Sequence, residues 1–193
     1  MLSTTIKLII LFFVIFDPLM SLAVFVSATK GMNTPDKRRT AIHGVLVAFA
    51  ISFAVLLLGQ KLLALFSTNL NDLRVGGGIV LGLLGIRMAL GQSVTESAAT
   101  EETSSRAVAA IIGSPLLTGP AAITAIIISA QDHGMIPSGI AIFFVLLVTT
   151  FIFLQATRIE RIIGKTVIQV FSTILGLISL SWAISFIRDG LGI

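Results

Sequence analysis

The chain of 193 residues contains no cysteine and no tyrosine, and it has only two histidines. The absence of cysteine excludes disulfide bonds, thiol catalysis and cysteine-ligated metals. His43 and His133 are far apart in the sequence, and no carboxylates cluster with either of them. We therefore expect neither a metal site nor a metal cofactor.

Charged residues are also scarce. They make up 11% of the chain, whereas 55% of the residues are hydrophobic. An average soluble protein carries about 25% charged residues, so this chain cannot cover itself with a polar surface. The composition predicts an integral membrane protein in a lipid bilayer. The 13 Lys and Arg lie mostly between apolar segments, which favours a role in membrane topology over nucleic-acid binding.

Long apolar runs are what the sequence has in abundance. A transmembrane helix needs roughly 20 mostly apolar residues. Six segments meet this requirement, and the first of them shows no evident signal-peptide cleavage site. We predict an all-α membrane protein with a single transmembrane domain (residues 1–193) and spans at about Ile6–Ala28, Ala41–Gly59, Leu73–Leu90, Ala107–Ala130, Ile136–Ala156 and Ile168–Ile187.

Basic residues are distributed unevenly between the two sides of these spans. Nine Lys and Arg belong to the first, third and fifth connections, and four belong to the opposite side. Because basic loops stay in the cytoplasm, both termini are predicted to lie outside. The polar linker at about 92–106 is then cytoplasmic. It separates a first half, about 1–91, from a second half, about 107–193. Each half has three spans, so a repeat between the halves would be inverted.

A short motif supports such a repeat. "DPLMS" (Asp17–Ser21) and "SPLLT" (Ser114–Thr118) both read polar, proline, leucine, apolar, hydroxyl, and each lies near the middle of the first span of its half. A weaker match joins "VLGLL" (Val80–Leu84) to "ILGLI" (Ile174–Ile178). We therefore predict two inverted three-helix repeats.

Proline in these motifs predicts that the first and fourth helices are discontinuous. It removes a backbone donor and clashes with the carbonyl four residues earlier. Two breaks that meet near the membrane midplane would present helix ends of opposite polarity, which suits a zwitterionic substrate. The alternative is a pair of packing kinks. The residues expected at the site are Asp17, Pro18, Ser21, Ser114, Pro115, Thr118, Gly119 and Pro120.

Asp17 is the most unusual of these residues. A charge at the bilayer centre costs about 2.5–3.5 kcal/mol on insertion scales, so such residues usually face a polar interior and have a role. Asp17 could bind a substrate ammonium group, carry a coupling proton, or cap the helix after the break. The sequence leaves these roles open.

The third span contains further candidates for helix packing or gating. Gly77, Gly78 and Gly82 permit close packing of helices, and they could also allow a neighbour to slide. Arg74 lies near the outer end of this span, where it could reach lipid headgroups, pair with Asp72 or meet a substrate carboxylate. No histidine or second carboxylate lies beside a serine or Asp17 at membrane depth, so we expect no enzymatic activity.

These motifs, in this order, resemble the MarC family of inner-membrane proteins. The first-span pattern is matched by Asp17, Pro18 and Phe25, although Met20, Ser21 and Ala23 depart from its common form. The third-span pattern is matched by Arg74, Gly77 and Gly78. The fourth-span pattern is matched by Pro115, Gly119, Pro120 and Ile123, with departures at Thr118 and Ala121.

The resemblance implies an inverted-repeat bundle in the cytoplasmic (inner) membrane that transports small neutral amino acids such as glycine and alanine. The departures around Met20 leave the substrate open. Export of another small metabolite or drug, or a non-transporting scaffold, are the alternatives. Coupling to protons or sodium, the direction of transport and oligomerisation are also open.

Overall fold

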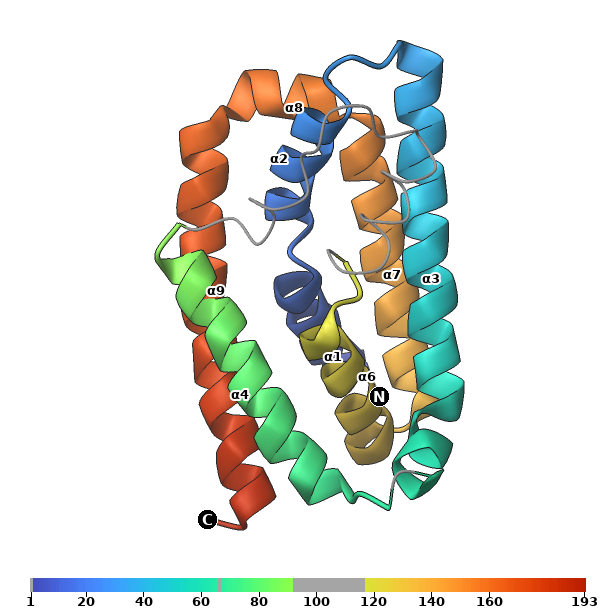
Figure 1. Cartoon of the computed structure of the whole chain (residues 1–193), viewed down its shortest axis with the longest axis vertical. Coiled ribbons are helices and arrows are strands. Elements are labelled where there is room, and N and C mark those ends of the chain that lie inside the picture. Colours follow the sequence, from blue (N-terminus) through green and yellow to red (C-terminus); the bar gives the residue numbers. More distant parts are fainter. Residues whose placement is uncertain (1, 66, 92–116) are drawn as a thin grey trace.

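The chain is built from α-helices joined by short turns (Figure 1). The computed structural model describes residues 2–65, 67–91 and 117–193, and no strand occurs within these ranges. Over this part of the chain, the all-helical prediction is confirmed. The helices are α1 (Leu2–Phe16), α2 (Pro18–Ala28), α3 (Thr34–Leu65), α4 (Leu70–Ala89), α6 (Pro120–His133), α7 (Met135–Leu154), α8 (Ala156–Ile163) and α9 (Lys165–Leu191).

Membrane-spanning length and apolarity are found in four helical stretches of the described residues: Leu2–Ala28, Thr34–Leu65, Met135–Leu154 and Thr166–Leu191. They contain the first, second and sixth predicted spans, and they cover the fifth except for Gln155 and Ala156. Helix α4 covers most of the third span, but Asp72, Arg74 and Arg87 make it too polar for this group. The fourth predicted span is described only from residue 117 onward. A total of six spans therefore stays a prediction.

The helices run alternately up and down (Figure 1). Helices α1 and α2 ascend in this view, α3 descends and α4 ascends, whereas α6 descends, α7 ascends and α9 descends. Both chain ends lie toward the lower end of the view. The turn between α2 and α3 and helix α8 lie at the upper end, and α4 ends lower, at about the level of the break between α1 and α2.

Helix packing is closest between α4 and α9, which lie against each other along much of their length. A Cβ on Gly78 would lie 2.8 Å from the Ala183 carbonyl, and one on Gly85 would lie 2.8 Å from the Gly176 carbonyl. Only glycine allows backbones to approach this closely. Gly82 faces Ala183 at an ordinary 3.5 Å, so the predicted glycines do lie in helix contacts.

The remaining helices enclose an aromatic and aliphatic core. Helix α3 packs on α7, α1 on α7, and α6 against α3, α4 and α7. Phe12 and Phe16 are fully buried, and Phe25 stacks on Phe153 with ring centroids 5.0 Å apart. Phe25 of the family pattern is thus a packing residue that holds α2 against α7.

The outward faces of the longer helices are apolar. Large hydrophobic side chains are exposed along α3, α7 and α9, including Leu46, Leu57, Phe143, Leu147, Phe151, Val170, Leu177 and Ile184. Patches of this extent would be unstable in water and are typical of surfaces that face lipid.

Candidate functional site

The first membrane helix is interrupted at Asp17. Helix α1 ends at Phe16 and α2 begins at Pro18, and Asp17 between them adopts a left-handed conformation (φ 37°, ψ 68°). Proline disfavours the right-handed helical conformation of the residue before it. Aspartate is among the few non-glycine residues that adopt the left-handed region readily. The predicted discontinuity of the first helix is confirmed.

Both carboxylate oxygens of Asp17 are hydrogen-bonded. Oδ1 accepts from the backbone amide of Met20 at 3.2 Å, which caps the start of α2. Oδ2 accepts from the hydroxyl of Ser172 on α9 at 2.7 Å. Asp17 is only 7% exposed, so these bonds replace much of the hydration that burial removes. The cap that the sequence suggested is therefore real, and the other oxygen joins the break to α9.

Ser172 is the functional candidate that sequence reasoning missed. It is fully buried and lies 155 positions from Asp17 along the chain. Serine is common in apolar membrane helices, so neither the residue type of Ser172 nor its position in the sequence predicts that it pairs with Asp17.

A second helix end lies close to this break. Gly119 is extended (φ −66°, ψ 177°) and supplies no side-chain cap, and α6 begins at Pro120. Proline suits this first helical position because its amide would have no partner within the helix. The amides of Ala121 and Ala122 follow, and no preceding turn of α6 is available to accept from them. Ser114 and Pro115 lie outside the described residues, so the predicted break of the fourth helix is seen only from its α6 side.

A cavity of about 320 Å³ lies between the two helix ends. Its walls come from the end of α1, the start of α2, the second half of α4 and the start of α6. Of the predicted site residues, Asp17, Ser21, Gly119 and Pro120 line it. The remainder of the wall is mostly apolar, with residues such as Val80, Leu83, Leu84 and Met88.

Three further residues lie in or beside the cavity. Pro18 and Thr118 are buried beside the cavity but are not among its described lining residues. Arg87 does line it, near the end of α4, and its side chain is exposed. The cavity therefore reaches from the buried Asp17 to the exposed Arg87 near the end of α4.

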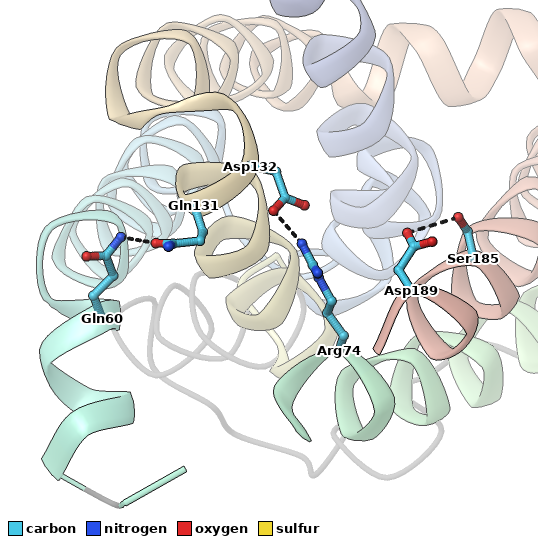
Figure 2. Close-up of polar contacts among 6 residues, drawn as sticks. All are labelled: Gln60, Arg74, Gln131, Asp132, Ser185 and Asp189. Atoms are coloured by element: carbon cyan, nitrogen blue, oxygen red, sulfur yellow. Dashed lines mark hydrogen bonds and ion pairs between the residues drawn. The ribbon is translucent and has the colours of Figure 1, made fainter. Parts of the chain in front are cut away.

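At the opposite end, polar side chains hold α6 to its neighbours (Figure 2). Arg74 of α4 forms an ion pair with Asp132 of α6, and Gln60 of α3 donates a hydrogen bond to Gln131 of α6. Arg74 thus pairs with Asp132 and not with Asp72, whose carboxylate accepts from Asn69 at 2.5 Å. We call Gln60, Arg74, Gln131 and Asp132 the α6 clamp.

Gly77 brings α4 against α6 between the clamp and the cavity. A Cβ at this position would lie 1.8 Å from Cγ2 of Thr124. Gly77 is therefore a contact of α4 with α6, whereas Gly78 and Gly82 face α9.

A family model for the "MarC family integral membrane protein" matches residues 2–193. The chain belongs to the MarC family. A MarC-family relative from Archaeoglobus fulgidus, named "UPF0056 membrane protein", is 27% identical over 187 residues, covering 93% of this chain and 88% of the relative. The "UPF0056 inner membrane protein MarC" of Escherichia coli O139:H28 is 25% identical over 194 residues, covering 91% of this chain and 88% of the relative.

Membership in the MarC family confirms the resemblance seen in the motifs. It agrees with the apolar helices in making the chain a membrane protein. No solved structure is significantly similar to it. Within the described residues, no group of three or more His, Asp or Glu is arranged to hold a metal ion.

Proposed function

We propose that the protein is a secondary transporter that moves small neutral amino acids, such as glycine or alanine, across the cytoplasmic membrane by alternating access. The observation that carries this proposal is the cavity between Asp17 and the start of α6. It offers a carboxylate on one side and the positive end of a helix on the other, in an otherwise apolar wall.

An amino acid in zwitterionic form suits these two poles. Its ammonium group would bind Asp17 and the hydroxyl of Ser21, and its carboxylate would bind the amides of Ala121 and Ala122. The apolar wall would receive a small uncharged side chain. Arg87, farther along the cavity, would attract the carboxylate during entry.

An inverted repeat is part of the proposal. Helices α1/α2, α3 and α4 would correspond to the segment that ends in α6, α7 and α9, and the two series run in opposite directions in Figure 1. In support, the contacts are reciprocal: α1 packs on α7 as α6 packs on α3, and the pairs α3–α7 and α4–α9 join equivalent members. Such symmetry permits an equivalent cavity that opens to the other side.

The two ends of the bundle differ as alternating access requires. One end carries the exposed cations Lys30, Arg38 and Arg158, and the α6 clamp joins α3, α4 and α6 toward the other end. The cavity reaches the exposed Arg87 near the end of α4, on the side of α4 away from the clamp. By the charge rule the basic end is cytoplasmic, which puts both termini outside. We infer an inward-facing state whose outer entrance is closed by the clamp.

Flux measurements test the proposal. Purified protein in liposomes should take up labelled glycine or alanine saturably, and repeating the assay under imposed proton and sodium gradients would identify the coupling ion. Empty liposomes are the control. Flux of another metabolite or of a drug, with no flux of amino acids, would contradict the substrate, and a non-transporting scaffold would show no saturable flux at all.

A further inference from the structure

Helix α8 lies across the end of the bundle that carries the exposed cations (Figure 1). It links α7 to α9 and contacts α2, α7 and α9. Ala156 is buried and Ile159 packs on the hydrophobic core, so one face of α8 is fixed to the protein. Gly164, with φ 76°, then turns the chain into α9.

The helix is strongly amphipathic. At 100° per residue, Ala156, Ile159, Ile162 and Ile163 share one face, and Thr157, Arg158, Glu160 and Arg161 share the other. Ile162 lies at the border of the apolar face, next to Arg158, and it is 82% exposed. A helix with isoleucine on one side and arginine on the other is typical of the boundary between lipid headgroups and acyl chains.

The neighbours of α8 fix its depth. Phe151 and Leu154 near the end of α7, and Val167 and Val170 near the start of α9, are exposed large apolar side chains. They belong to stretches that are able to span a membrane. Since α8 lies between those two ends, its apolar edge is placed at the top of the acyl-chain region and its polar face among the headgroups.

The charges on the polar face of α8 indicate which kind of lipid headgroup this helix would bind. Arg158 and Arg161 are exposed, and neither forms an ion pair or hydrogen bond with another described residue. Lys30 and Arg38 are exposed at the same end, while Asp36 and Glu160, the acidic residues at this end among those that the structure describes, are partly buried. Unpaired guanidinium groups bind phosphate oxygens in a bidentate manner.

We propose that α8 is an interfacial helix that binds anionic phospholipid headgroups through Arg158 and Arg161, while Ile162 inserts among the acyl chains. The bound lipid fastens the α7–α9 connection to the membrane surface. This proposal is independent of the transported substrate, because its residues lie outside the cavity.

The test compares thermal unfolding in lipid nanodiscs of phosphatidylcholine alone with nanodiscs of phosphatidylcholine and phosphatidylglycerol in equal amounts. Trp182 is the only tryptophan and reports unfolding by fluorescence. The wild type should unfold at a higher temperature in the anionic discs, and added salt should reduce that gain. The double variant Arg158→Gln/Arg161→Gln should lose most of the gain. Arg158→Lys/Arg161→Lys should keep much of it.

A matched control removes the same charge at the other end of the bundle. Lys61 and Arg188 are both exposed, and Lys61→Gln/Arg188→Gln should retain the full gain. Inorganic phosphate added to phosphatidylcholine discs should not reproduce the gain, because free phosphate is not anchored at the membrane surface beside α8. Equal gains for wild type and the Arg158/Arg161 double Gln variant, equal loss in the control, or no gain in the wild type would overturn the proposal.

Discussion

Asp17 combines two tasks that usually fall to different residues. Its left-handed backbone makes the break, and its carboxylate joins the start of α2 to Ser172 of α9. Residues in such sparsely populated conformations cluster at functional sites, because the surrounding fold must hold them there. Asparagine has the same shape, tolerates the same backbone conformation and caps helices equally well.

Asp17→Asn should therefore fold normally but lose gradient-driven accumulation of substrate, since the amide carries no charge. Exchange of substrate across the membrane should be less affected. Accumulation and counterflow in the same liposomes measure the two properties, and an unchanged unfolding temperature serves as the folding control. If the variant accumulates substrate at the wild-type rate and affinity, Asp17 is a structural cap only.

Ser172→Ala removes the hydroxyl that Asp17 accepts from. A hydrogen bond to a charged group contributes about 1.5–3 kcal/mol, so the equilibrium constant for folding or for substrate binding should fall about ten-fold to 150-fold. The matched control is Ser179→Ala on the same helix. Ser179 is also buried, but its hydroxyl has no partner among the described residues. Unfolding and uptake should be nearly unchanged in the control, and equal losses in both variants would count against the Asp17–Ser172 link.

Single site residues could be predicted from the sequence where they are conspicuous in an apolar run. Asp17 and Pro18 qualify because a charge and a proline are costly inside a membrane helix. Ser172 and Gln131 do not qualify, since their importance comes from partners on other helices. Arg74 was recognised, but its partner Asp132 depends on how α6 lies against α4, which local sequence does not determine.

Helices α4 and α6 meet at Gly77, where no side chain fits. Gly77→Ala would place a methyl group 1.8 Å from Thr124 Cγ2 and force the helices apart. Such overpacking costs about 1–3 kcal/mol, so the unfolding temperature should fall and transport should slow.

The control is its neighbour Gly76, where a Cβ would meet nothing within 4 Å. Gly76→Ala should leave stability unchanged or raise it, because alanine favours helix by about 1 kcal/mol. Thermal unfolding of both variants in the same detergent makes the comparison. A Gly77→Ala protein as stable as Gly76→Ala would show that this helix contact is not close.

The α6 clamp is the other contact that decides how α6 can move. The chain has no cysteine, so Gln60→Cys/Gln131→Cys introduces a single pair across α3 and α6. A short bifunctional methanethiosulfonate reagent, which spans the length of the two glutamine side chains, should link the helices and stop transport, and reduction should restore it. Single-cysteine variants are the controls. Full activity after complete cross-linking would show that α6 does not separate from α3 during the cycle.

The elements themselves were predicted from apolar length with fair success. The first, second and sixth spans fall within helices of spanning length, and the fifth was placed two residues too long at its end. Helix α8 was not predicted, because eight residues with alternating arginine and isoleucine resemble a charged loop until their angular positions are considered. The end of the fourth span was placed within three residues of the observed end of α6 at His133.

For the whole molecule, the distribution of charge predicts which end faces the cytoplasm. Gly31→Cys lies in the turn between α2 and α3, and Ile193→Cys lies at the exposed chain end. In intact cells, an impermeant thiol reagent should label the second and not the first, which should react only after permeabilisation. Labelling of both from outside would contradict an odd number of spans between these positions.

The arrangement of helices around the cavity is less accessible from sequence. Alternation of apolar runs gives the order and direction of helices, and Figure 1 agrees with the expected alternation. The alternation of apolar runs does not predict that α4 packs mainly against α9, because this pairing joins distant segments through close glycine contacts. Neither periodicity nor composition specifies which glycine faces meet.

The pairing of α4 with α9 has a consequence for biosynthesis. Helix α4 ends at Ala89, whereas α9 begins only at Lys165, so α4 leaves the ribosome well before its partner. Until then the glycine face of α4 faces lipid without its partner, in a helix too polar to rank among the spanning stretches. Synthesis of α9, not insertion of the first spans, is therefore the event that gives α4 its packing partner. A nascent chain that stalls before Lys165 would leave α4 as the segment exposed to membrane quality-control proteases.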